Sequence, residues 1–179
     1  MRIKKPFKKK MNSVKSIFRI LTSLAIILWL LSSCQEKIEY PIEPEIAFQD
    51  YLYLLNSDST IDRGLLILSF TDGDGDIGLV DDVDTLPPYD FNLFIDYYEF
   101  REGEWKQLVD PSSGDTINFN GRIPMLTPAG KNKNISGTIE DTLFLNLFSD
   151  YDSFRYEVYI KDRALHESNR IVTPILLKP

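Results

Sequence analysis

The chain has 179 residues, a formal net charge of −7, one cysteine and one histidine. A single cysteine excludes disulfide bonds within the chain and metal sites built from several thiolates. Eight of the 20 Lys and Arg residues precede residue 20 and all 27 acids follow residue 33, so residues 34–179 alone carry a formal charge of −15. Such an acidic surface repels nucleic acid and anionic lipid, and its natural partners are cations.

The N-terminus has the three-part pattern of a secretory signal peptide, which we assign to residues 1–33. A basic region is followed by the apolar run Ile20–Leu31, and the run ends in Leu31-Ser32-Ser33-Cys34. A membrane-spanning helix needs about 20 apolar residues, so a transmembrane segment is the weaker alternative. Met11 is an alternative start, because a charged region and the apolar run both follow it.

The sequence Leu31-Ser32-Ser33-Cys34 resembles the lipobox of bacterial lipoproteins. The resemblance implies cleavage before Cys34, acylation of that cysteine with palmitate-type chains, and a membrane anchor in the cell envelope. The alternative is an ordinary cleavage site with a chance cysteine. Several acyl chains hold a protein firmly, because each buried methylene adds about 0.8 kcal/mol. Gln35, in place of an aspartate after the cysteine, favours the outer membrane, and either side of that membrane stays open.

Downstream of the signal peptide we expect the lipidated cysteine with a short tether at residues 34–45 and one domain at residues 46–179. The domain alternates apolar and polar residues with period two, most clearly in Phe154–Lys161, which predicts half-buried strands. The other predicted strands are Ile46–Leu55, Gly64–Phe70, Phe91–Arg101, Glu104–Val109, Ile117–Ile123, Ile135–Leu147 with a break near Glu140 and Asp141, and Arg170–Leu177.

Seven to eight strands with turn-rich links predict an all-β fold, an antiparallel immunoglobulin-like (Ig-like) sandwich, with a small barrel as the alternative. The stretches Tyr156–Ala164 and Ser168–Pro174 resemble the last two strands of Ig-like or fibronectin type III-like modules. The chain lacks the paired cysteines of antibody domains, which excludes that subtype.

One stretch indicates a specific chemistry: Phe70-Thr71-Asp72-Gly73-Asp74-Gly75-Asp76-Ile77-Gly78-Leu79. Alternate residues of a curled loop can aim carboxylates at one point, and calcium takes six to eight oxygens at about 2.3–2.6 Å. We therefore predict a structural calcium site. Its predicted ligands are Asp72, Asp74 and Asp76, with Asp81, Asp82 and Asp162 as further candidates.

Three other interpretations of this stretch are weaker. Its G-x-G-x-x-G pattern does not indicate a dinucleotide site, because three carboxylates would repel a pyrophosphate and no helix is predicted after it. It departs from an EF-hand, since Ile77 takes the sixth position and Val83 the twelfth. Ordinary Asp-Gly turns remain an alternative, although residues 64–100 contain nine acids and no Lys or Arg.

The place of this stretch in an Ig-like fold suggests Asp162 and Glu167 as outer ligands. If the strand ending at Phe70 is B and the strand ending near Asp162 is F, the stretch lies in the B–C loop and shares one end of the sandwich with the F–G loop. The tether, with Glu43 and Glu45, would then lie at the same end.

The remaining candidate residues favour structural roles. His166 is expected to be a solvated loop residue, because no serine is marked as its nucleophilic partner. Tyr97, Tyr98, Phe100 and Trp105 lie on a predicted hairpin; a core position is the first interpretation, and an exposed sugar or peptide platform of Tyr98, Phe100 or Trp105 is the second.

Together, the lipobox, the aspartate-rich stretch and the last strands resemble small outer-membrane lipoproteins of Bacteroidota. We expect a non-enzymatic, lipid-anchored binding or accessory module with a glycan or protein partner, a membrane contact through Cys34 and no nucleic acid partner. Such a module predicts an exposed apolar patch near residues 71–90 or 163–169. The alternative is a glycosidase-like hydrolase, which predicts two acids facing each other about 5–9.5 Å apart across a cleft.

Overall fold

The computed structural model describes residues 17–23, 39–80, 83–110, 112–126 and 133–179. The chain divides into two compact units, Met1–Ile38 and Glu39–Pro179. Residues 17–23 of the first unit form a short α-helix. Within the described part of the chain, no helix combines the length and the apolar character needed to cross a membrane. The predicted cleavage site and Cys34 lie outside the described residues.

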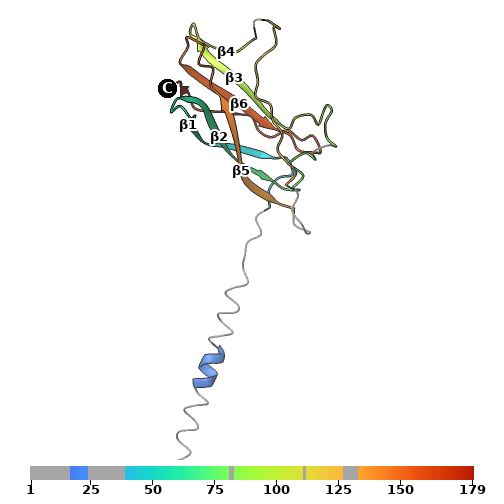
Figure 1. Ribbon diagram of the computed structural model, residues 1–179. Helices are drawn as coiled ribbons and strands as arrows, with labels where there is room; N and C mark the ends of the chain where they lie inside the picture. The colour runs from blue at the N-terminus through green and yellow to red at the C-terminus, as the bar shows by residue number, and fades with distance from the viewer. Residues whose placement is uncertain (1–16, 24–38, 81–82, 111, 127–132) are drawn as a thin grey trace, which may run out of the picture. The chain divides into compact units, whose positions relative to one another are not determined.

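The second unit is an all-β sandwich of two antiparallel sheets (Figure 1). One sheet has the order β1-β2-β5, formed by β1 (Glu45–Leu55), β2 (Ile61–Asp72) and β5 (Ile135–Phe144). The other has the order β4-β3-β6-β7, formed by β3 (Leu93–Arg101), β4 (Glu104–Gln107), β6 (Ser153–Ile160) and β7 (Ile171–Val172). The short β8 (Leu176–Leu177) pairs with the first residues of β6.

This strand order confirms the predicted antiparallel sandwich of seven to eight strands. The strands β1, β2 and β5 take the positions of A, B and E in an Ig-like domain, and β3, β6 and β7 take those of C, F and G. Strand β4 extends the second sheet beside β3, as C′ does. The aspartate-rich stretch therefore begins in the last residues of B and continues into the B–C loop, and Asp162 follows F.

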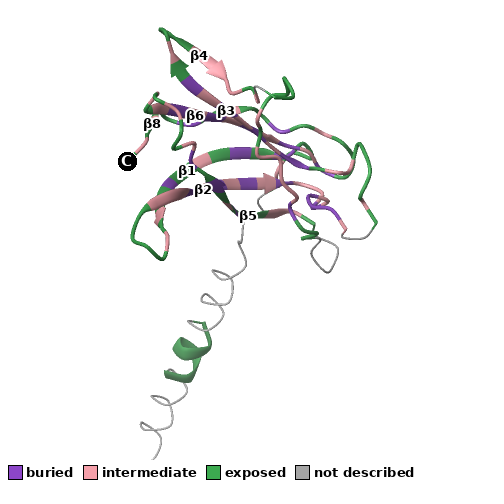
Figure 2. Ribbon diagram, turned by 45° about the horizontal axis from the view of Figure 1, so that its top comes forward, coloured by how far each residue is buried: buried purple, intermediate pink, exposed green. Residues whose placement is uncertain are grey.

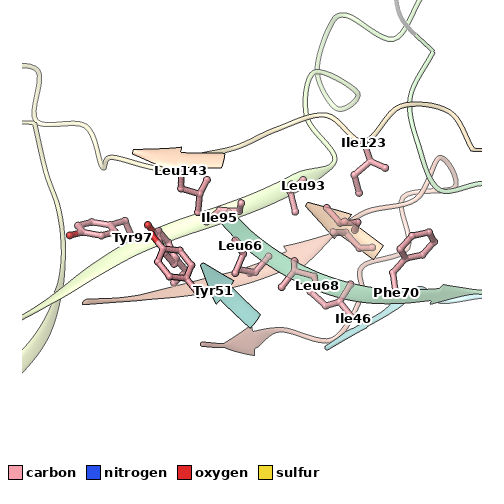
Figure 3. Close-up of a cluster of buried hydrophobic side chains, with 14 of the residues drawn as sticks. Ile46, Tyr51, Leu66, Leu68, Phe70, Leu93, Ile95, Tyr97, Ile123 and Leu143 are labelled. Carbon is pink, nitrogen blue, oxygen red and sulfur yellow. The ribbon is translucent and has the colours of Figure 1, made fainter. Parts of the chain in front are cut away.

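The core lies between the two sheets and follows the period-two pattern. Every second residue of β6 is buried, and β2 alternates in the same way (Figure 2). Figure 3 shows side chains of both sheets meeting, among them Leu66 and Leu68 from β2 and Ile95 and Tyr97 from β3. Each fully buried side chain of this size contributes about 1.5–3 kcal/mol through the hydrophobic effect.

Besides shifts of a few residues at strand ends, three of the predicted strands differ from the sequence-based expectation. Residues 117–123 form only isolated pairs with β3, Asp96 with Asn118 and Leu93 with Gly121. The expected break near Glu140 is absent, because the inward side chains of Ile139 and Leu143 keep the period of two across it. The last predicted strand is divided into β7 and β8 at Pro174, which has no backbone N–H to donate.

The strand registers bring several segments to one end of the sandwich. Residues 45 and 136 pair with Thr71, so the start of β1, the end of β2 and the start of β5 lie together. In the other sheet the start of β3 pairs with the end of β6. The backbone N–H of Arg163 lies 3.4 Å from the carbonyl oxygen of Asp76 and joins the two groups. The B–C and F–G loops thus share this end.

Candidate metal centre

Asp72 lies at the very end of β2 and is completely buried. It pairs with Ile135 of β5, so it belongs to the strand rather than to the loop that follows. Its Oδ2 accepts a hydrogen bond of 3.0 Å from the backbone N–H of Ile77. Its Oδ1 is buried and has no hydrogen-bond partner among the described residues. A buried carboxylate oxygen without a partner lowers the stability of the fold, unless a cation or a hydrogen-bond donor binds to it.

Asp74 and Asp76 bring two more carboxylates to the same place. The three aspartates each offer one oxygen, and these oxygens lie within 4.8 Å of one another. Asp74 and Asp76 also each have a buried Oδ1 without a hydrogen-bond partner in the described part of the chain. Three carboxylates that converge in this way, each with a buried oxygen lacking a partner among the described residues, match the demand of a hard cation.

The charges of the three side chains repel one another. Burial raises the pKa of the Asp76 carboxyl to about 6, with further contributions from the negative charges of Asp162, Asp74 and Asp72. Burial likewise raises the pKa of Asp72, and contact with Asp74 adds to the effect. A bound cation would reverse both effects, because it stabilises the ionised form of each carboxyl.

The loop that carries Asp74 and Asp76 is held in shape by its own apolar residues. Ile77 is fully buried and belongs to the core cluster, and Leu79 is almost fully buried. The backbone N–H of Leu79 donates to the carbonyl of Ile123 at 2.9 Å. Gly75 has a φ of +65°, which a residue with a Cβ rarely adopts. The curl that aims the carboxylates inward is therefore fixed by the fold.

Asp162 lies beside this group but does not join it. Its side chain is almost fully buried, and both carboxylate oxygens are engaged by His166, one by the backbone N–H and the other by Nδ1, each at 2.8 Å. The hydrogen bond and the charge of Asp162 raise the pKa of His166. The structure thus places Asp162 close enough to act on the charge of Asp76, but outside the converging set. Asp81 and Asp82 lie outside the described residues.

Two contributors to the site were missed in the sequence. Ile77 interrupts the Asp-Gly pattern. An isolated apolar residue in an acidic loop indicates a side chain that is buried in the core and holds the loop in place. His166 follows Asp162 by four residues, a spacing that lets a loop histidine fold back on an acid. His166 is therefore partly solvated, as expected, but it also closes the F–G loop on itself through Asp162.

A second buried acid forms a closed structural network at Glu99. Its two carboxylate oxygens accept hydrogen bonds from five side chains: Tyr97, Arg101, Asn146, Ser149 and Lys178. Burial would raise the pKa of Glu99, but these donors outweigh it and lower the pKa to about 2. With its acceptors filled, Glu99 offers no oxygen to an added ligand.

The aromatic hairpin divides between the core and the outer face. Tyr97 is buried, whereas Tyr98, Phe100 and Trp105 lie on the outer face of the second sheet. The guanidinium of Arg155 lies 4.6 Å from the ring centre of Trp105 and 5.6 Å from that of Tyr98. Arg155 therefore covers one face of each of these rings, whereas Phe100 remains exposed at 43%.

A cavity of about 260 Å³ lies beside β5, lined in part by Arg122, Glu140 and Asp141. The Nη1 of Arg122 donates to the carbonyls of Asp84, Tyr89 and Asp90 and thereby holds the B–C link. Glu140 and Asp141 are consecutive in a strand, so their side chains leave on opposite faces. They do not form the facing pair that the hydrolase alternative requires.

Comparison with known proteins identifies no relative. No protein-family model matches the chain, and searches of curated proteins and of solved structures find no significant match.

Proposed function

We propose that this chain is a lipid-anchored protein of the cell envelope whose Ig-like domain binds calcium and acts as a binding or accessory module. The observation that carries the calcium proposal is the convergence of Asp72, Asp74 and Asp76, whose offered oxygens lie within 4.8 Å of one another and each of which has a buried oxygen without a partner in the described chain. A cation satisfies all three at once.

The donor set favours calcium over other metals. Carboxylate and carbonyl oxygens suit calcium, magnesium and manganese. Zinc and copper prefer sulfur and nitrogen ligands, and the three aspartates offer only oxygen. Calcium accepts six to eight ligands in irregular geometry, while magnesium demands a near-ideal octahedron. A loop built from alternating aspartates and glycines fits the more permissive ion. Outside the cytoplasm, calcium sites with dissociation constants of about 10⁻⁴–10⁻³ M are sufficient.

The ion would stabilise one end of the sandwich. It neutralises the repulsion at Asp72 and Asp76, and it links the end of β2 to the loop that leads to β3. An ion that binds only the folded state adds about 2.7 kcal/mol of stability when its concentration is 100 times the dissociation constant. The role we propose for calcium is therefore structural.

The test of the calcium proposal is a thermal unfolding series of the protein in detergent, with EDTA and with millimolar calcium. We expect the melting temperature to rise with calcium in the wild type and to stay constant in Asp74→Asn. The control is Asp58→Asn, which removes the same charge from an exposed turn between β1 and β2. A wild-type melting temperature that calcium leaves unchanged would refute the proposal.

The membrane anchor is proposed from the lipobox-like sequence ending in Cys34. The expected result is incorporation of labelled palmitate into the wild-type protein and recovery of the protein with the outer membrane. Cys34→Ser should lose the label, whereas Ser33→Ala should keep it. Label in the Cys34→Ser protein would contradict the anchor.

The partner surface of the module is proposed beside the ion site. Large apolar side chains are exposed in the two segments that follow B and F: Val83 and Leu86 in the B–C link, at 72% and 73%, and Leu165 in the F–G loop, at 40%. They fall in the two ranges where a binding module predicts its patch, and they suit a glycan or protein partner. Crosslinking from residue 86 in cells, with and without chelation of calcium, would identify the partner; adducts that form equally well from residue 58 would argue against this surface.

A further inference from the structure

We propose that the segment immediately before β1, Glu39–Pro44, is part of the calcium site, and that calcium holds this segment against the domain. We call it the lead-in segment; in the chain it connects the domain to Cys34. The inference rests on the proposed calcium site and assigns to it a second role, which is control of the link between the domain and its anchor.

The first observation is a close approach of the lead-in backbone to Gly73. A Cβ at this glycine would lie 2.3 Å from the carbonyl oxygen of Tyr40 and 2.4 Å from that of Pro41. Gly73 is the residue between Asp72 and Asp74, so these two carbonyls lie against the backbone of the aspartate loop itself. Only a residue without a side chain permits this packing.

The second observation is a clamp that fixes the end of the lead-in segment. Asn169, in the F–G link, accepts a hydrogen bond from the backbone N–H of Ile46 at 2.8 Å and donates one to its carbonyl at 2.9 Å. Pro44 is buried next to this point. The chain thus enters β1 in one fixed direction, and that direction carries Tyr40 and Pro41 across the aspartate loop.

The third observation concerns the oxygens available for an ion. Three carboxylates are too few for calcium, whose shell of six to eight oxygens is commonly completed by backbone carbonyls and water. Carbonyl oxygens approach the loop at two of its glycines: those of Tyr40 and Pro41 at Gly73, and that of Lys133, 2.1 Å from a Cβ placed on Gly75. We propose these carbonyls as candidates for the missing ligands.

Charge supplies the reason why docking would depend on the ion. The lead-in segment contains Glu39 and Glu43, and β1 starts with Glu45. Because the Tyr40 and Pro41 carbonyls lie against Gly73, the lead-in segment brings these acids to the same end of the domain as Asp72, Asp74 and Asp76. A bound cation attracts both segments, whereas its removal leaves them to repel each other.

Linkage makes the coupling reciprocal. If calcium favours the docked lead-in segment, the docked segment must raise the affinity for calcium by the same factor, typically about 5–150-fold. Loss of the ion would release six residues between the domain and Cys34, and the reach and stiffness of the link would change accordingly.

The test measures amide hydrogen exchange of the complete protein in detergent, with calcium and with EDTA. Four lead-in residues have an amide proton: Glu39, Tyr40, Ile42 and Glu43. We expect their exchange to slow at least about fivefold with calcium, while the β3–β4 turn at Glu102 and Gly103 exchanges equally in both conditions.

The matched variants are Gly73→Ala and Gly121→Ala. The first places a methyl group against the Tyr40 and Pro41 carbonyls, and the second meets only ordinary contacts of 3.5 Å or more; neither has a positive φ. We expect Gly73→Ala to weaken calcium binding about fivefold or more and to abolish the slowing in the lead-in segment, and we expect Gly121→Ala to behave as the wild type.

The outcomes separate this inference from the calcium site on which it rests. If calcium raises the melting temperature but leaves lead-in exchange unchanged, the inference is wrong and the calcium site stands. That measurement needs only the wild type, so it decides the question even if Gly73→Ala does not fold. If calcium changes neither quantity, both proposals fail.

Discussion

Lys178, the penultimate residue of the chain, forms an ion pair with Glu99 of β3 in which Nζ lies 2.9 Å from Oε1. Both side chains are shielded from solvent, and the Lys178 backbone N–H also donates to the carbonyl of Asp152. The pair joins the end of the chain to the central region of the second sheet, at a place where the hydrophobic effect alone would favour two apolar side chains. Removal of either charge would therefore leave the other buried without its partner, which destabilises the fold.

Removal of the acid from this network should be strongly destabilising. Glu99→Gln leaves Lys178 and Arg101 without their shared carboxylate, and breaking a buried pair from one side costs about 3–5 kcal/mol. Urea unfolding followed by far-UV circular dichroism measures the loss. Glu102→Gln is the control, because its pair with Lys106 lies on the surface; a loss as large in Glu102→Gln would show that burial of the pair is not the cause.

The same carboxylate predicts the acid sensitivity of the fold. The folded pKa of Glu99, about 2, lies below its ordinary value of 4.5. A depressed pKa stabilises the fold above pH 4.5, and this contribution, about 3 kcal/mol, is lost as the pH falls from about 4.5 to 2. Unfolding free energies measured across this range should decline in the wild type and decline less in Glu99→Gln. Parallel pH curves for the two proteins would refute the assignment.

Asp76→Asn should have opposite effects with and without calcium. In EDTA the substitution removes one of the repelling charges and should raise the melting temperature by about 2–4 °C, as expected for about 1 kcal/mol in a domain of this size. In millimolar calcium the wild type should be the more stable protein. Differential scanning calorimetry in the two buffers measures the melting temperature of each protein and shows whether their order reverses. A variant less stable than the wild type in both buffers would show that Asp76 stabilises the fold without an ion.

Substitution of Ile77 should lower both the stability of the fold and the affinity for calcium. Ile77→Ala removes a fully buried side chain and should cost about 2–5 kcal/mol. Because Ile77 also donates its N–H to Asp72, loss of its anchor should weaken calcium binding as well. Val83→Ala, at an exposed position of the same link, is the control. Isothermal titration measures the calcium affinity, and urea unfolding measures the stability. An unchanged calcium affinity in Ile77→Ala would show that calcium binding does not depend on burial of this side chain in the core.

Local patterns predicted the strands and the three converging aspartates. The alternation of apolar and polar residues in Phe154–Lys161 involves only neighbouring residues, and it directly predicts a half-buried strand. In the same way, Asp72, Asp74 and Asp76 are close in the chain, so their spacing alone was enough to suggest a shared cation. Even here the boundary moved, because pairing with Ile135 extends β2 to Asp72.

Only the tertiary structure decided which distant groups meet these elements. It engages Asp162 with His166 and so keeps it out of the converging set, and it brings the carbonyls of Tyr40 and Pro41 against Gly73. It also joins Lys178 to Glu99 across 79 residues. The contacts of Tyr40, Pro41 and Lys178 join residues far apart in the chain, which no local pattern encodes, whereas Asp162 and His166 are four residues apart in one loop. The sequence by itself determined the strands and the acidic loop, and the packing of the sandwich decided what surrounds that loop.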